Sequence, residues 1–79
     1  MSGLMPDHEG HRCLELVKSG RALLAADRRP EAIEFGRQAL EILERYPDDS
    51  YAMMVRDTLV SAIARTEEIL ARRNLMDQE

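Results

Sequence analysis

The segment from Gly20 to Leu43 constrains the fold of this chain most strongly. It contains two stretches with apolar residues at three- and four-residue spacing, separated by a short polar stretch around Pro30. Small side chains on facing helices allow two backbones to approach closely. The segment places such residues where two helices would cross, so it predicts an antiparallel helical hairpin: Gly20, Ala22, Ala32, Gly36 and Ala39.

Helical periodicity continues on both sides of this hairpin, and we expect helices over about 11–26, 30–46 and 51–73. Pro30 suits the first turn of the second helix. The residue before Pro47 is pushed out of the helical region, and Asp49 or Ser50 can cap the third helix. Short connections favour neighbours of opposite direction. The predicted fold is therefore an all-α antiparallel three-helix bundle.

The second helix carries more apolar residues than one interface needs. Nine of the fifteen residues from 32 to 46 are apolar or small. A face this broad predicts a central helix that touches both of its neighbours.

With 79 residues the chain has room for one small domain. Residues 1–9 contain Gly3 and Pro6 and show no periodicity, so we expect a flexible N-terminal arm. The three-helix domain is expected over 10–73, followed by a frayed tail over 74–79.

The hairpin resembles a tetratricopeptide repeat. Leu16, Gly20, Ala22 and Leu23 occupy positions of the first helix in that pattern. Ala32 and Ala39 fall on the two alanine positions of the second helix, and residues 46–49 look like the turn that leads into the next unit. The resemblance covers about 34 residues, and the single helix that follows looks like a capping helix.

The whole chain is also similar to MIT domains, which are three-helix modules of tetratricopeptide-like build. Residues 65–70, RTEEIL, resemble the signature of their third helix. The resemblance implies a groove between the second and third helices that accepts a partner helix. It also implies apolar contacts from Ile63 and Ile69 and charged contacts from Arg65 and Glu67.

Composition excludes several classes of function. The formal net charge of −4 argues against nucleic acid as the main partner, because phosphate binding needs a basic face. No apolar stretch reaches the length of a membrane span, and the N-terminus lacks the pattern of a signal peptide. A single cysteine cannot form an intrachain disulfide. We therefore expect a cytoplasmic protein with no membrane contact.

The chain offers little catalytic chemistry. His8, His11 and Cys13 form an H-x-x-H-x-C cluster of side chains that can bind zinc. No second cluster supplies a fourth ligand, and Cys13 also fits the apolar stripe as a buried thiol. The carboxylates follow surface spacing with arginine partners, and no glycine-rich phosphate loop is present. We expect no metal, no cofactor and no enzymatic activity.

The surplus of apolar residues instead predicts a protein-binding adaptor. The expected surface lies on the face shared by the second and third helices, where acidic residues such as Glu34 and Glu67 favour a partner peptide or amphipathic helix with basic flanks. Its candidate residues are Phe35, Ile42, Met53, Val60, Ile63 and Glu67. Two alternatives remain open: a subunit that self-associates as a dimer or larger oligomer, and a small helical chaperone or regulator that shields a partner's apolar helix.

Overall fold

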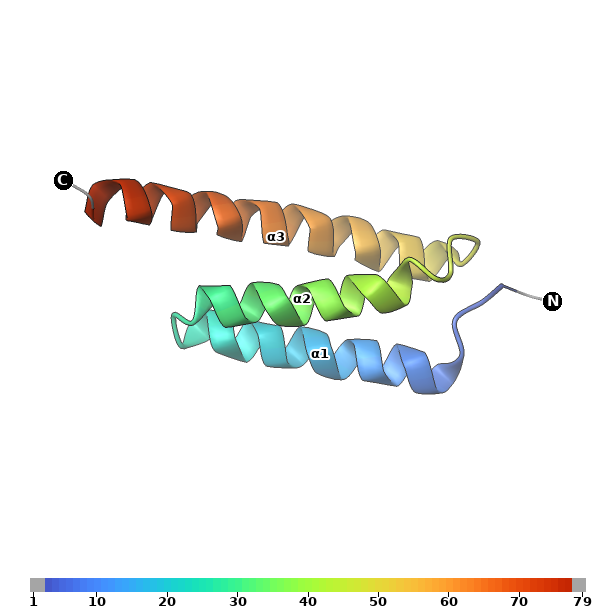
Figure 1. Ribbon diagram of the computed structural model, residues 1–79. Helices are drawn as coiled ribbons and strands as arrows, with labels where there is room; N and C mark the ends of the chain where they lie inside the picture. The colour runs from blue at the N-terminus through green and yellow to red at the C-terminus, as the bar shows by residue number, and fades with distance from the viewer. Residues whose placement is uncertain (1–2, 78–79) are drawn as a thin grey trace.

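The computed structural model describes residues 3–77, which form α1 (Asp7–Ala25), α2 (Arg29–Leu43) and α3 (Ser50–Asp77) (Figure 1). No strand occurs within these residues, so the predicted all-helical class is confirmed. α2 packs against both α1 and α3, as its broad apolar face predicts. In contrast, no Cα atom of α1 lies within 8 Å of one in α3. The two outer helices are therefore joined through α2.

The core lies where small residues bring the helices together. A central cluster of buried side chains takes members from all three helices: Cys13, Ala39, Leu43 and Ala52. Gly20 is also buried, and α2 packs closely on it: a Cβ atom built at Gly20 would lie 3.6 Å from the Ala32 carbonyl oxygen. Ala22 has a different position, since its side chain is exposed rather than at the helix crossing.

α1 begins at Asp7, four residues before the expected start. Pro6 acts as the N-cap residue, and its carbonyl oxygen accepts hydrogen bonds from the Glu9 and Gly10 N–H groups. Glu9 also accepts a hydrogen bond from the Tyr46 hydroxyl group, which raises the pKa of that phenol, and pairs with Arg45 at 3.4 Å. These contacts hold the beginning of α1 against the end of α2. Met1 and Ser2, the first residues of the expected arm, lie outside the described residues.

The α1–α2 turn is a Schellman motif. The Arg28 N–H donates to the Leu23 carbonyl oxygen at 2.8 Å, and the Asp27 N–H donates to that of Leu24 at 3.0 Å. Asp27 has a φ of 61°, a left-handed conformation that aspartate tolerates better than most residues do. Pro30 follows in the first turn of α2, as expected from its fixed φ.

Pro47 lies in the second turn, between α2 and α3. α2 ends at Leu43 rather than at Tyr46, because the N–H groups of Arg45 and Tyr46 bond to carbonyl oxygens three residues back, in tighter turns. Asp49 caps α3: its Oδ1 atom accepts the Ala52 N–H at 3.1 Å. The Asp49 Oδ2 atom accepts the Met5 N–H at 2.9 Å, so the N-terminal segment is docked at this turn.

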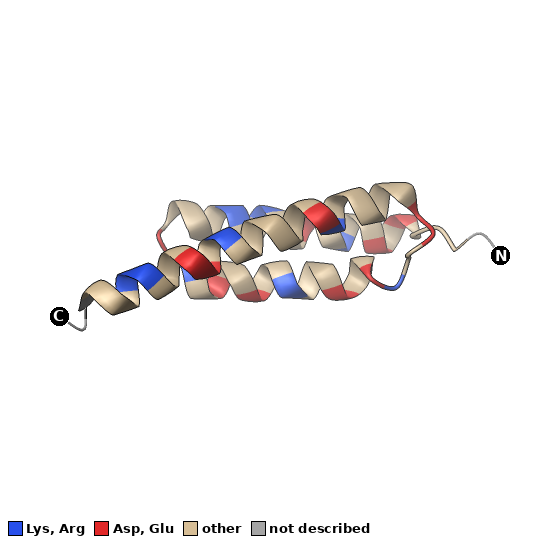
Figure 2. Ribbon diagram, turned by 90° about the horizontal axis from the view of Figure 1, so that it is seen from above, with Lys and Arg blue, Asp and Glu red and all other residues tan. Residues whose placement is uncertain are grey.

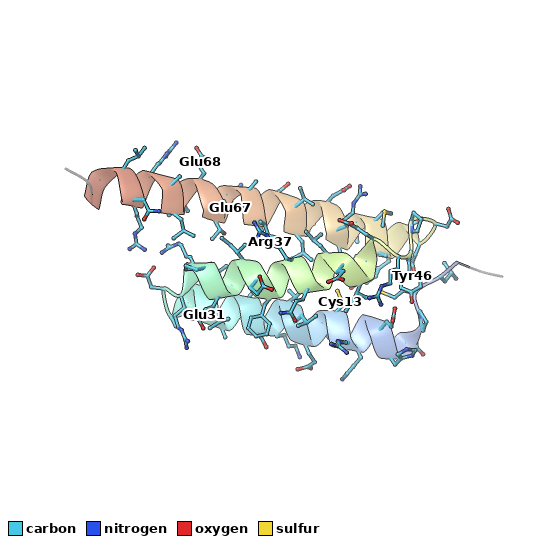
Figure 3. The ribbon with its side chains drawn as sticks, viewed as in Figure 1. Cys13, Glu31, Arg37, Tyr46, Glu67 and Glu68 are labelled. Atoms are coloured by element: carbon cyan, nitrogen blue, oxygen red, sulfur yellow. The ribbon has the colours of Figure 1, made fainter. Side chains whose placement is uncertain are left out.

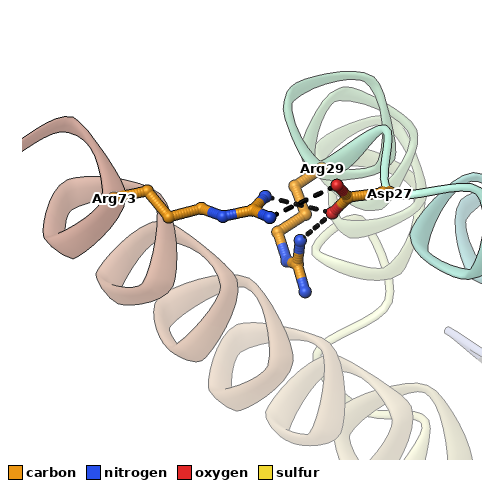
Figure 4. Close-up of polar contacts among 3 residues, drawn as sticks. All are labelled: Asp27, Arg29 and Arg73. Atoms are coloured by element: carbon orange, nitrogen blue, oxygen red, sulfur yellow. Dashed lines mark hydrogen bonds and ion pairs between the residues drawn. The ribbon is translucent and has the colours of Figure 1, made fainter. Parts of the chain in front are cut away.

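α3 continues to Asp77 instead of ending at Arg73, since residues 74–77 contain no helix breaker. Figure 1 shows its last turns projecting beyond the α1–α2 turn. Figure 2 shows acidic and basic residues interspersed along all three helices. Arg73 pairs with Asp27 at 3.0 Å and Asp27 also pairs with Arg29, which ties α3 to the α1–α2 turn (Figure 4). Gln78 and Glu79 of the expected tail lie outside the described residues.

Candidate functional site

A long apolar groove lies between α1 and α3, with α2 as its floor. We call it the α1–α3 groove, and its volume is about 510 Å³. Its inner surface includes Cys13, Val17, Gly36, Leu43, Leu59 and Ile63. Its rims are formed by Leu14, Lys18, Arg21 and Leu24 from α1 and by Tyr51, Met54 and Thr58 from α3. The groove runs between the two outer helices, which pack on α2 with no Cα atom of one within 8 Å of a Cα atom of the other.

Large apolar side chains stand exposed on both rims. Leu14 is 47% exposed on the α1 side, and Leu24 is also exposed. On the α3 side Tyr51 is 62% exposed and Met54 is 60% exposed. Burial of such side chains is favourable, so an apolar occupant that covers them would gain binding free energy.

The threonine hydroxyls of the groove are hydrogen-bonded within the chain. The Thr66 hydroxyl donates to the Ala62 carbonyl oxygen at 2.8 Å, and the Thr58 hydroxyl donates to that of Met54 at 3.1 Å. The Cys13 Sγ atom lies 4.0 Å from the Ala39 carbonyl oxygen, and burial raises the pKa of this thiol. Hydrogen bonds from the threonine hydroxyls therefore stay inside α3, and the groove presents carbon surface.

The charged residues that line the groove are both basic. Among residues 3–77 they are Lys18 and Arg21, one helical turn apart on α1. No ion pair to either one forms within the part of the chain that the structure describes. The groove thus has an apolar lining with two cationic side chains, and no acidic side chain lines it within residues 3–77.

The residues predicted from the sequence are scattered around α2 and α3. Ile63 is half-buried and lines the groove. Phe35 and Met53 are half-buried at helix contacts, with Met53 packed on the core. Ile42 is buried and lines a small polar hollow between α1 and α2. Val60 is exposed and does not line the groove.

Glu67, the sixth predicted residue, is also outside the groove lining. It is exposed and accepts a hydrogen bond from Arg37 at 3.1 Å, so this pair joins α2 and α3 (Figure 3). Glu34, the other acidic residue behind the expectation of a basic partner, is exposed and does not line the groove either.

Sequence reasoning missed the residues on the groove rims. A stripe on α1 carried a usable signal, because its members follow a spacing of four, three and three residues beside the buried stripe: Leu14, Lys18, Arg21 and Leu24. On α3 no comparable signal exists, since Tyr51 and Met54 lie among apolar residues on every side of that helix.

The histidines do not join Cys13 in a metal site. His8 and His11 are exposed near the start of α1, whereas Cys13 is buried against α2. Within residues 3–77 no group of three or more histidine, cysteine or acidic side chains is placed to hold a metal ion. None of the described helices is long and apolar enough to cross a membrane.

Comparison of the chain with protein-family models, curated proteins and solved structures gives no match.

Proposed function

We propose that this chain is a non-enzymatic protein-interaction module, an adaptor that binds an amphipathic helix of another protein in the α1–α3 groove. One observation carries the proposal: no Cα atom of α1 lies within 8 Å of one in α3, and apolar side chains from all three helices line the space between them. An occupant that contacts both outer helices would bury the exposed rim residues, and burial of apolar surface contributes about 25 cal/mol per Å².

The shape of the groove favours a helix over a compact ligand. Its lining on α3 runs from Tyr51 to Thr66, a helical length of about 22 Å. α1 and α3 pack on two sides of α2, in the same way that two neighbouring helices pack on one helix of a four-helix bundle. The fourth position of such a bundle corresponds to the groove.

The proposal includes an antiparallel arrangement of tetratricopeptide or MIT type. Contacts at both ends of the molecule support it. Met5 and Asp49, which precede α1 and α3, are hydrogen-bonded to each other, and Asp27 at the end of α1 pairs with Arg73 near the end of α3. The docking position differs from the α2–α3 face that the MIT resemblance implies, because only Ile63 of the six predicted residues lines the groove.

A second copy of this chain is a weaker candidate for the occupant. A twofold interface sets the same patch of both copies together. It would bring four cations, Lys18 and Arg21 from each copy, into an apolar surface that no acidic residue lines within residues 3–77. Like charges in one interface oppose association.

The test uses a displayed library of amphipathic helical peptides, selected for binding to the wild-type chain. The affinity of the selected peptides is then measured for Leu14→Asp, Met54→Asp and Val60→Asp by fluorescence anisotropy. Leu14 and Val60 are matched, since they are 47% and 49% exposed and only Leu14 lines the groove. We expect at least about tenfold weaker binding for the two groove variants and little change for Val60→Asp.

Three results would overturn the proposal. The first is that no peptide binds, and the second is that Val60→Asp weakens binding while Leu14→Asp does not. The third is a wild-type dimer in sedimentation equilibrium that Leu14→Asp dissociates, because a second copy would then occupy the groove. Circular dichroism of each variant shows that the helices are retained.

A further inference from the structure

We infer that the partner helix carries acidic side chains in its first half, where they face Lys18 and Arg21. This inference rests on the proposed function, because it specifies the chemistry of the helix that enters the α1–α3 groove. From the acidic residues of α2 and α3, the sequence alone predicts a partner with basic flanks. The groove instead favours a partner with acidic side chains.

The first support is the position of the two cations. Lys18 and Arg21 lie on the α1 rim between the exposed apolar residues Leu14 and Leu24. A helix seated in the groove must therefore pass both charges. An apolar or basic side chain at that point would leave two cations next to carbon surface without a partner, whereas a carboxylate would pair with them.

The second support is that most other basic residues of the surface, apart from Arg12 and Arg65, are already paired. Arg28, Arg37, Arg56 and Arg72 each contact an acidic side chain of this chain, at distances from 2.5 to 3.1 Å. Lys18 and Arg21 form no such pair within residues 3–77. Their charges remain available to an occupant.

The third support is that the charge of the groove lining has the opposite sign to the net charge of the whole chain. The formal net charge is −4, yet the charged residues that line the groove within residues 3–77 are both positive. At physiological salt the screening length is about 8 Å. Two cations at the rim therefore act more strongly on a seated side chain than acidic residues that lie more than a screening length away.

The direction of the partner follows from α1 and α3. Both helices run from the Met5–Asp49 contact toward the Asp27–Arg73 pair. A fourth helix antiparallel to both would place its N-terminal half beside Lys18 and Arg21. Carboxylates are favourable near a helix N-terminus because the helix dipole is positive there. The same acidic residues would satisfy both the dipole and the two cations.

The experiment sequences the peptides that the displayed library yields and repeats the selection on Lys18→Glu/Arg21→Glu. The matched control is Arg12→Glu/Arg65→Glu, which changes the net charge equally at two exposed arginines outside the groove lining. We expect aspartate and glutamate to be enriched in the first half of wild-type binders. We also expect about tenfold weaker binding of these peptides to the groove double variant, and a smaller loss for the control.

The two proposals fail in different ways. Peptides that lose affinity on Leu14→Asp but show no acidic enrichment, or carry acidic residues only in their second half, would overturn the inference and leave the groove as the docking site. An equal loss on both double variants would also overturn it, because the effect would then come from net charge. Peptides that are insensitive to Leu14→Asp and Met54→Asp would overturn the proposed function itself.

Discussion

Gly36 of α2 lies against the tip of Ile63 of α3. A Cβ atom built on Gly36 would stand 3.1 Å from the Ile63 Cδ1 atom and 3.2 Å from its Cγ1 atom. The other buried helical glycine, Gly20, has more room, because its Cβ atom would meet its nearest neighbour at 3.6 Å. The missing side chain at Gly36 therefore sets how closely α3 approaches α2.

The two glycines should respond differently to alanine. Gly20→Ala should raise the free energy of unfolding by about 0.5–1 kcal/mol, since alanine loses less backbone entropy in a helix. Gly36→Ala crowds Ile63 and should be about 1–2 kcal/mol less stable than Gly20→Ala. Urea denaturation measures both. In an Ile63→Ala background, which removes both the Cδ1 and the Cγ1 atoms, Gly36→Ala should cost less; equal effects in both backgrounds would contradict the crowding.

Asp49 should stabilise the chain through its cap and through the docked N-terminal segment. Asp49→Ala should lower the free energy of unfolding by about 1 kcal/mol, because it removes the acceptor of the Ala52 N–H. Asp48→Ala, at the neighbouring exposed aspartate, is the control and should change stability little. The result would be contradicted if the two variants had the same urea midpoint.

The same carboxylate should make stability depend on pH. Hydrogen bonds from the Met5 and Ala52 N–H groups lower the pKa of Asp49 in the folded state. Its contribution is therefore present above the unfolded pKa of about 4 and lost as the pH falls through the lower folded pKa. Between these limits wild type should lose more stability than Asp49→Ala does. Denaturation curves of both proteins across the acidic range measure this difference.

Asp27 should report the contact between the end of α3 and the α1–α2 turn. Hydrogen bonding and charge from Arg73 lower the pKa of this carboxylate, with a further contribution from Arg29. Arg73→Ala should move the Asp27 titration, followed by NMR of the carboxyl carbon, back toward its usual range. Arg72→Ala removes a pair within α3 and should leave the titration unchanged. A titration insensitive to Arg73→Ala would show that the pair does not form in solution.

The Cys13 thiol should react slowly and only at high pH. Burial raises its pKa, so less thiolate is present at a given pH and reagents reach it poorly. The control is Cys13→Ala/Ser19→Cys, which moves the thiol to an exposed position of α1. Rates of alkylation measured against pH should be lower for wild type, with the midpoint at higher pH. Equal profiles would contradict the burial.

The sequence predicts the helices well because their periodicity is local. The nine apolar or small residues between 32 and 46 correctly indicate that α2 is central. The start of α1 was missed, since Pro6 and Gly10 have the composition of a loop. Its contacts with Arg45 and Tyr46 come from the segment that follows α2, and such tertiary contacts leave no local pattern.

The groove was harder to predict because apolar residues occur on every side of α3. Val60 and Met54 are equally apolar in sequence, yet only Met54 lines the groove. The contact between Gly36 and Ile63 fixes which side of α3 faces α2, and therefore which side faces the groove. That pairing depends on how two helices meet, which the spacing within one helix does not specify.

The separation of the α1 and α3 backbones also affects how the chain unfolds. α1 and α2 share a more extensive interface than α2 and α3 do. Hence α3 can separate first, while the hairpin formed by the other two helices persists. A bound fourth helix would contact both α1 and α3 and so link the hairpin and α3 into one cooperative unit. Slower amide hydrogen exchange along α3, far from any new hydrogen bond, would then be the thermodynamic signature of occupancy.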